Sequence, residues 1–184
     1  FEHDSCGVGF VCDIKGRPSH RMVLDGIQIL EHLNHRGATG SDPLTGDGAG
    51  LLVQMPDKFF RKECARANIE LPPPGDYGVG MIFFPRNFES RNVIQEWLER
   101  VIRQEGQRFL GWRDVPIDPG HIGPVAKSGM PVFRQLFIAR GKDTPRERFE
   151  LALYVIRKRM FNKVEESILR EKRYFISFIG KSFR

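Results

Sequence analysis

The sequence predicts a layered domain of mixed helix and strand, of the α/β or α+β class. Patterns typical of strands alternate with patterns typical of helices along the chain, and several strand patterns are short and flanked by glycine. The 184 residues are 40% hydrophobic and include 15 phenylalanines, which is sufficient for one packed core. We therefore expect one globular domain, and the sequence indicates no second domain boundary.

The first third of the chain predicts a strand, a helix, a loop and a second strand. Residues 6–14 alternate loosely and meet a turn signal at 15–18, so they predict a strand. From Ser19, which can cap a first turn, apolar residues recur at helical spacing to about Asn34. The glycine-rich stretch that follows, HRGATGSDPLTGDGAG, predicts an irregular loop, and LLVQM at 51–55 a short buried strand.

The remainder predicts helices and strands in alternation. LPPPGD predicts a rigid turn, Thr144 to Glu147 a capping box with proline at the first helical position, and Cys64 lies in a charged helical segment. Strands are predicted at YGVGMIFFP, 109–115, 132–139 and 174–179, and helices around 93–101 and 149–160.

Charge and hydropathy indicate few partners. The net charge is +6, but 29 basic residues are mixed with 23 acidic ones, and glutamates interrupt the basic run at 157–173. We expect that run to form a solvated helical face, with no nucleic acid bound. The apolar stretches are shorter than the roughly 18 residues of a membrane-spanning helix, so no membrane association is expected. Three cysteines that fit no zinc ribbon or disulfide framework favour a cytoplasmic setting.

The chemistry centres on Cys6, for which the residues alone leave two interpretations. A cysteine attacks as a thiolate, which needs a nearby base or positive charge, and His3, His32, His35 and Arg36 are candidates by sequence. A free cysteine is otherwise commonly a small buried hydrophobe, and Cys12, six residues further along the same predicted strand, is expected to pack in a core. A metal site is not expected, because the histidines lack a partner set at ligand spacing.

Two stretches carry a resemblance to a known family. CGVGFVCDIKGRPSH and LEHLNHRGATGSDPLTGDGAGLLVQMP resemble the amino-terminal glutamine amidotransferase domain of glutamate synthases, a class II amidotransferase. YGVGMIFFP, GWRDVPID, IGPVAKSGMPVFRQLFI and LALYVIRKRM resemble the same domain in the same order. The resemblance therefore covers nearly the whole chain.

The resemblance implies an α+β fold, the four-layer αββα sandwich of Ntn hydrolases, present here as an incomplete domain. Residues 6–184 would be the amino-terminal part of the amidotransferase domain, and residues 1–5, FEHDS, a propeptide-like lead that is cleaved ahead of the cysteine. Before that cleavage the nitrogen of Cys6 is a peptide amide without a basic lone pair.

The resemblance also implies the reaction. Cys6 would be the nucleophile that attacks the side-chain amide of L-glutamine, with its own α-amine as base, and the ammonia would be transferred to 2-oxoglutarate. Arg36 would support the nucleophile and its amino terminus, Gly37 and Gly48 would let the backbone pass close to the site, and Asp47 would organise the loop. The residues alone allow a helix-terminal arginine and an ordinary glycine-rich turn.

Other parts of the family's machinery are not found in this sequence. The oxyanion Asn-Gly pair and the residues that bind glutamine are expected beyond Arg184, so the chain alone is expected to be a poor glutaminase. The parent enzyme would use FMN and an iron–sulfur cluster, neither housed in this segment. The remaining synthase domains are expected partners, with a reductase subunit as a further candidate, and the electron donor stays open. The alternative is a non-catalytic scaffold that acts in assembly.

Overall fold

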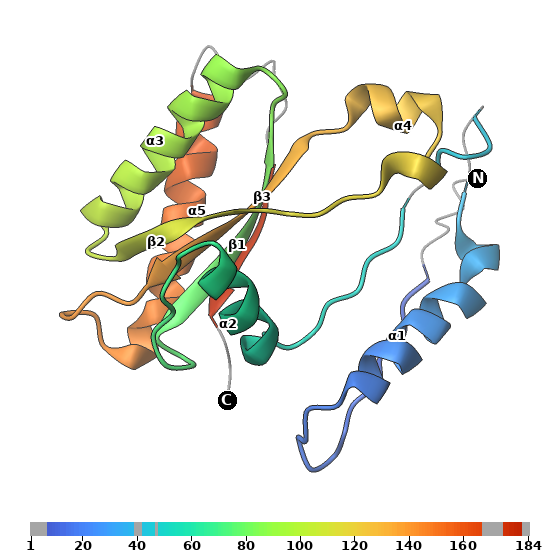
Figure 1. Ribbon diagram of the computed structural model, residues 1–184, viewed down its shortest axis with the longest axis horizontal. Helices are drawn as coiled ribbons and strands as arrows, with labels where there is room; N and C mark the ends of the chain where they lie inside the picture. Colours follow the sequence, from blue (N-terminus) through green and yellow to red (C-terminus); the bar gives the residue numbers. More distant parts are fainter. Residues whose placement is uncertain (1–6, 39–41, 47, 167–174, 182–184) are drawn as a thin grey trace. The chain divides into compact units, whose positions relative to one another are not determined.

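The computed structural model describes residues 7–38, 42–46 and 48–166 together with the backbone of 175–181, and the chain divides into two compact units (Figure 1). Unit 1 comprises residues 1–53 and 117–130, and unit 2 comprises residues 54–116 and 131–184.

Unit 2 is built on an antiparallel sheet of four strands in the order β2-β3-β1-β4. Tyr77 pairs with Ala139 at one end of the β1–β3 ladder, and Phe84 pairs with Val132 at the other. The strands of this sheet, all four predicted from the sequence, are β1 (Tyr77–Phe84), β2 (Arg108–Asp114), β3 (Val132–Ala139) and β4 (Phe175–Lys181).

Two long helices, α3 (Phe88–Gln104) and α5 (Phe149–Glu165), cover one face of this sheet side by side (Figure 1). Asn87 caps α3 through its side-chain oxygen, and the apolar residues behind it recur at helical spacing. Leu98 and Ile102 of α3 are fully buried in the core against the sheet. The helices predicted around 93–101 and 149–160 are thus formed, and their apolar faces are buried in this core.

The opposite face of the sheet is covered by α2 (Asp57–Arg66). Phe60 and Cys64 of this helix pack against Tyr77 and Phe137 of the sheet. Cys64 is therefore fully buried, although most of its helix is charged.

The proline-rich turn at 71–76, which the sequence predicts to be rigid, is held in place by hydrogen bonds from α2. Arg61 donates to the carbonyl oxygens of Leu71 at 3.1 Å and Pro72 at 2.7 Å, and also to Asp57 at 2.9 Å. The Tyr77 hydroxyl donates to the same Asp57 carboxylate at 2.8 Å, and burial raises the pKa of this hydroxyl.

The predicted capping box at Thr144 is wrong. The helix begins after a 3-10 turn, η3 (Arg146–Arg148), and no side chain caps it. The Thr144 hydroxyl instead accepts a hydrogen bond from Gln107 Nε2 at 2.8 Å. The Thr144 hydroxyl thus bonds to a residue distant in sequence, Gln107, and not to the helix that the local pattern indicated.

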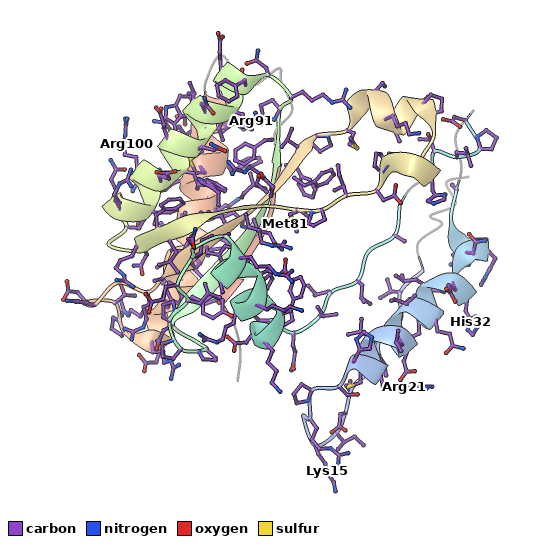
Figure 2. All side chains as sticks on the ribbon, viewed as in Figure 1. Lys15, Arg21, His32, Met81, Arg91 and Arg100 are labelled. Atoms are coloured by element: carbon purple, nitrogen blue, oxygen red, sulfur yellow. The ribbon has the colours of Figure 1, made fainter. Side chains whose placement is uncertain are left out.

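The described residues of unit 1 form four helical segments. Ser19 caps the first of them as predicted, since its hydroxyl accepts from the Arg21 N–H at 3.1 Å. Figure 2 labels Arg21 and His32 near the two ends of this helix. The four are α1 (His20–His32), η1 (Asn34–Arg36), η2 (Pro119–His121) and α4 (Pro124–Gly129).

The strands predicted at 6–14 and 51–55 are not formed in the described residues of these segments, 7–14 and 51–55. An extended segment becomes a strand only when a neighbour accepts and donates its backbone hydrogen bonds. Neither segment has such a ladder here, and Val8 and Phe10 are 92% and 89% exposed. The described structure accordingly contains one sheet rather than the two of a four-layer sandwich.

Within the described residues, no helix combines the length and the apolar character needed to cross a bilayer.

Candidate active site

The segment that follows Cys6 lies against helix α1. Cys6 itself is outside the described residues. A methyl group added at Gly9 would come within 2.5 Å of Ile29 Cγ2, and one added at Gly7 within 3.1 Å of Leu33 Cδ2. Ile29 and Leu33 are one helical turn apart on one face, so the two glycines of the CGVG motif let the backbone run along that face.

Arg36 is brought beside this segment by the 3-10 turn that continues α1. Its backbone N–H donates to the Leu33 carbonyl at 2.8 Å, which closes the turn. A methyl group added at Gly7 would be 3.2 Å from Arg36 Cβ. The structure therefore brings Arg36 next to the residue that follows Cys6.

Gly37 follows the 3-10 turn in an extended conformation, with φ −83° and ψ 147°. The nearest atom to a methyl group added there is the Asn34 carbonyl oxygen at 3.4 Å, an ordinary contact. Neither backbone strain nor close packing in the described residues requires a glycine at this position.

Gly48 differs, because its φ of +84° lies in the left-handed region that L-residues with a side chain rarely adopt. No described atom lies within 4 Å of a methyl group added there, so the requirement for glycine comes from conformation. Asp47, the predicted organiser of the loop, is outside the described residues.

A compact turn stands in the middle of the same loop, at residues 42–45. The Thr45 hydroxyl donates to Asp42 Oδ2 at 2.8 Å, and the Leu44 N–H donates to Asp42 Oδ1 at 3.1 Å. The pKa of Asp42 lies below its usual value, and the largest cause is the hydrogen bond from Thr45. The hydrogen bonds from the backbone N–H groups of Leu44 and Val125 lower this pKa further.

The described cysteines differ from expectation. Cys12 was predicted to pack in a core on a strand face, but it is exposed, because residues 7–14 form no strand. Cys64 is buried, and desolvation raises the pKa of its thiol to about 11. Cys64 is thus protonated and inaccessible at neutral pH, which makes it a poor nucleophile.

The histidines near Arg36 face solvent. His32 and His35 are exposed, and His35 Nδ1 lies 3.0 Å from the carbonyl oxygen of His32. Among the residues that the structure describes, no three His, Cys, Asp or Glu side chains gather into a metal-binding group.

The family model of the class II glutamine amidotransferases matches residues 6–183. Because the match spans nearly the whole chain, the chain belongs to the class II glutamine amidotransferases. This family has the Ntn-hydrolase fold. The family assignment drawn from the two motif stretches is thereby confirmed.

Curated relatives narrow the comparison. Over 163 residues the chain is 51% identical to the glutamate synthase (NADPH) large chain of Bacillus subtilis. The aligned region is 88% of this chain and 11% of that protein. It is 39% identical over 164 residues to the glutamate synthase (NADH) of Schizosaccharomyces pombe, covering 86% of this chain and 8% of that protein.

A plant relative extends the match over nearly the full chain. The chloroplastic ferredoxin-dependent glutamate synthase 2 of Arabidopsis thaliana is 34% identical over 181 residues, which is 98% of this chain and 11% of that protein. The chain thus spans about a tenth of the length of the relatives it matches.

Sequence reasoning missed one contact in this region: the turn at Asp42 packs against Gly123, whose backbone N–H donates to the Leu44 carbonyl oxygen at 3.0 Å. The DPLT sequence signals a turn, because aspartate before proline readily forms such hydrogen bonds. No local pattern indicates that the turn meets a segment so far along the chain.

Proposed function

We propose that this chain supplies the nucleophile for the glutaminase half-reaction of a glutamate synthase, which the whole protein carries out. The Cys6 thiolate attacks the side-chain carbonyl carbon of L-glutamine and the C–N bond breaks. The leaving nitrogen takes up the proton that the base removed from the thiol and departs as ammonia. Water then hydrolyses the γ-glutamyl thioester to glutamate and regenerates the thiol. The observation that carries the proposal is the packing of Gly7 against Arg36, which brings the two motifs of the family together.

The proposed base is the α-amine of Cys6. An α-amine with a pKa near 7.7–8.0 can accept the thiol proton at neutral pH, whereas a peptide nitrogen cannot. The proposal therefore requires that the bond between Ser5 and Cys6 is cut, with residues 1–5 as the removed lead.

Arg36 is proposed to hold the amino terminus of the cleaved chain beside the nucleophile. Its Cβ is in van der Waals reach of the backbone at Gly7, so a long cationic side chain from this position can extend to the preceding residue. Gly37, Asp47 and Gly48 are proposed to shape the loop that borders the site, and the left-handed backbone of Gly48 supports this for one of them.

We propose the four-layer αββα arrangement for the complete domain. The apolar side chains of Val8 and Phe10 are exposed in a segment with a strand pattern, and Leu52 in the second such segment is 88% exposed. Both segments lie against α1, because a methyl group at Gly26 would also come within 2.8 Å of Leu51. This supports a second sheet that α1 covers.

The ammonia is proposed to pass to 2-oxoglutarate in the remaining synthase domains of the whole protein, alone or with a reductase subunit. The names of the relatives include NADPH, NADH and ferredoxin, so any of these could supply the electrons. FMN and the iron–sulfur cluster are proposed to lie in those other domains. The three cysteines of this chain, one of them buried in unit 2, do not fit the four thiolates that common clusters require.

The test is a pair of cysteine substitutions in the whole protein. Cys6→Ala should abolish glutamine-dependent glutamate synthesis and leave ammonia-dependent synthesis intact, because only the glutaminase needs the thiol. Cys12→Ala is the matched control, since Cys12 is an exposed cysteine six residues further on, and it should keep both activities. Glutamine-dependent synthesis by Cys6→Ala would refute the proposal and would favour a non-catalytic scaffold, for which the relatives and the described structure offer no support.

A further inference from the structure

Asp42 connects the glycine-rich loop to helix α4. Its carboxylate accepts hydrogen bonds from Thr45 and Leu44 within the loop, and a further one from the backbone N–H of Val125 in the first turn of α4. The first N–H groups of a helix have no partner within the helix, so a carboxylate from elsewhere can satisfy one of them.

The loop and α4 are joined by the backbone as well. The Gly123 N–H donates to the Leu44 carbonyl oxygen at 3.0 Å. This hydrogen bond lies beside the carboxylate contact, so residues 42–45 and the start of α4 are fixed to each other at two points.

Close packing makes this contact sensitive to a single methyl group. A methyl group added at Gly123 would collide with Asp42 Oδ2 and would come within 2.5 Å of Thr45 Oγ1. The backbone of Gly123, with φ −69° and ψ 163°, is one that any residue adopts. The position thus excludes a side chain because of the Asp42 turn and not because of its own conformation.

We propose that Asp42 is a positioning residue for the glutaminase reaction, which fixes residues 42–45 on α4 at Gly123 and thereby helps to position Arg36 and Gly48, the described residues of the proposed site on either side. This inference rests on the proposed function. Asp42 touches neither substrate nor nucleophile in it, and it acts through the loop.

The contact between residues 42–45 and Gly123, called the clamp below, lies where it can affect the chemistry. One end of the loop follows Arg36, and the other carries Gly48, so both ends belong to the proposed site. Ordering loop residues costs conformational entropy, and a misplacement of about 1 Å at a site can cost about 100-fold in rate. A fixed point between the ends reduces both penalties before glutamine binds.

Two substitutions disturb the contact between Asp42 and Gly123, and a third serves as the matched control. Asp42→Ala removes the carboxylate, and Gly123→Ala adds the methyl group that collides with it. Gly129→Ala adds the same methyl group at the end of the same helix, where no described atom lies within 4 Å. All three are made in the whole protein and assayed with glutamine and with ammonia.

We expect Asp42→Ala and Gly123→Ala to lower kcat for glutamine-dependent synthesis at least tenfold, to change KM for glutamine less than threefold, and to leave ammonia-dependent synthesis unchanged. Gly129→Ala should match the wild type in all three. Hydrogen exchange over residues 42–48 should become faster in the two clamp variants and not in the control. Asp42→Asn, which keeps an acceptor oxygen, should retain more activity than Asp42→Ala.

Clamp variants with wild-type glutamine-dependent kcat, in an enzyme that depends on Cys6, would overturn the positioning role and leave the proposed function standing. An equal loss in Gly129→Ala would also overturn it, because the collision would then be irrelevant. Should Asp42→Ala fail to fold, Asp42→Asn and Gly123→Ala decide the question by the same criteria. Glutaminase activity that does not need Cys6 would overturn the proposed function and the positioning role together.

Discussion

Cys64 should make the folded chain less stable at alkaline pH. Its thiol is fully buried between α2 and the sheet, and this desolvation raises its pKa from 9.0 to about 11. Below pH 9 the thiol is protonated in both the folded and the unfolded chain, so it contributes nothing to the pH dependence. As the pH rises from 9 to 11, the unfolded chain loses the proton while the folded chain keeps it, and unfolding is favoured.

The magnitude follows from the two pKa values. A tenfold difference in proton affinity corresponds to about 1.4 kcal/mol, so a folded pKa of about 11 against 9.0 costs about 2.7 kcal/mol above pH 11 and about 1.9 kcal/mol at pH 10.5. A loss of this size is a large share of the stability of an ordinary domain.

The assay compares the free energy of unfolding of the wild type and Cys64→Ala between pH 8 and pH 10.5. Urea unfolding can be followed by tryptophan fluorescence, because Trp97 and Trp112 both pack against the core of unit 2. The cavity left by the alanine lowers stability equally at both pH values, so only the difference in pH dependence reports on the thiol. The wild type should lose about 2 kcal/mol more than the variant over this range.

Parallel pH profiles for the two proteins would refute the reasoning, because they would show that the thiol does not resist ionisation in the fold. Rapid alkylation of Cys64 by iodoacetamide in the folded chain at pH 8 would contradict the burial from which the pKa shift arises.

Three further substitutions test the fold around the site and the core, each by its free energy of unfolding. Gly48→Ala should destabilise by about 1–2 kcal/mol because of the left-handed backbone, whereas Gly50→Ala, with no positive φ and no atom within 4 Å, should not. Leu98→Ala should cost about 2–5 kcal/mol in the core, against under about 1 kcal/mol for Val93→Ala on the exposed side of α3. Ser19→Ala should cost about 1 kcal/mol by removing the α1 cap. Equal effects within either pair, or a neutral Ser19→Ala, would contradict the structure.

The strands of unit 2 could be predicted because their partners lie in the same chain. The bounds of β3 agree with the predicted 132–139, and its neighbours β1 and β2 were predicted from the same kind of pattern. Residues 7–14 have an equally good strand pattern, but pattern reports the preference of a segment and not whether a neighbour pairs with it. The same error placed Cys12 in a core, because a strand was assumed when its face was assigned.

The candidate site was predictable to the extent that it is local. The helix predicted to end near Asn34 places Arg36 just after the helix, where the structure has it in a 3-10 turn. The helix face that Gly7 and Gly9 contact could be identified only from the structure, and so could Gly123 as the partner of Asp42. The same holds for Thr144, because its hydroxyl accepts a hydrogen bond from Gln107 although its local pattern predicts a helix cap.

The central claim is that Cys6 is an amino-terminal nucleophile for glutamine. The most direct measurement treats the whole protein with a glutamine analogue that carries a diazoketone in place of the side-chain amide, and locates the adduct by peptide mass spectrometry. The account predicts one adduct, on Cys6, in a peptide whose first residue is Cys6. An adduct on Cys12, or on a Cys6 peptide that still begins with FEHDS, would contradict it.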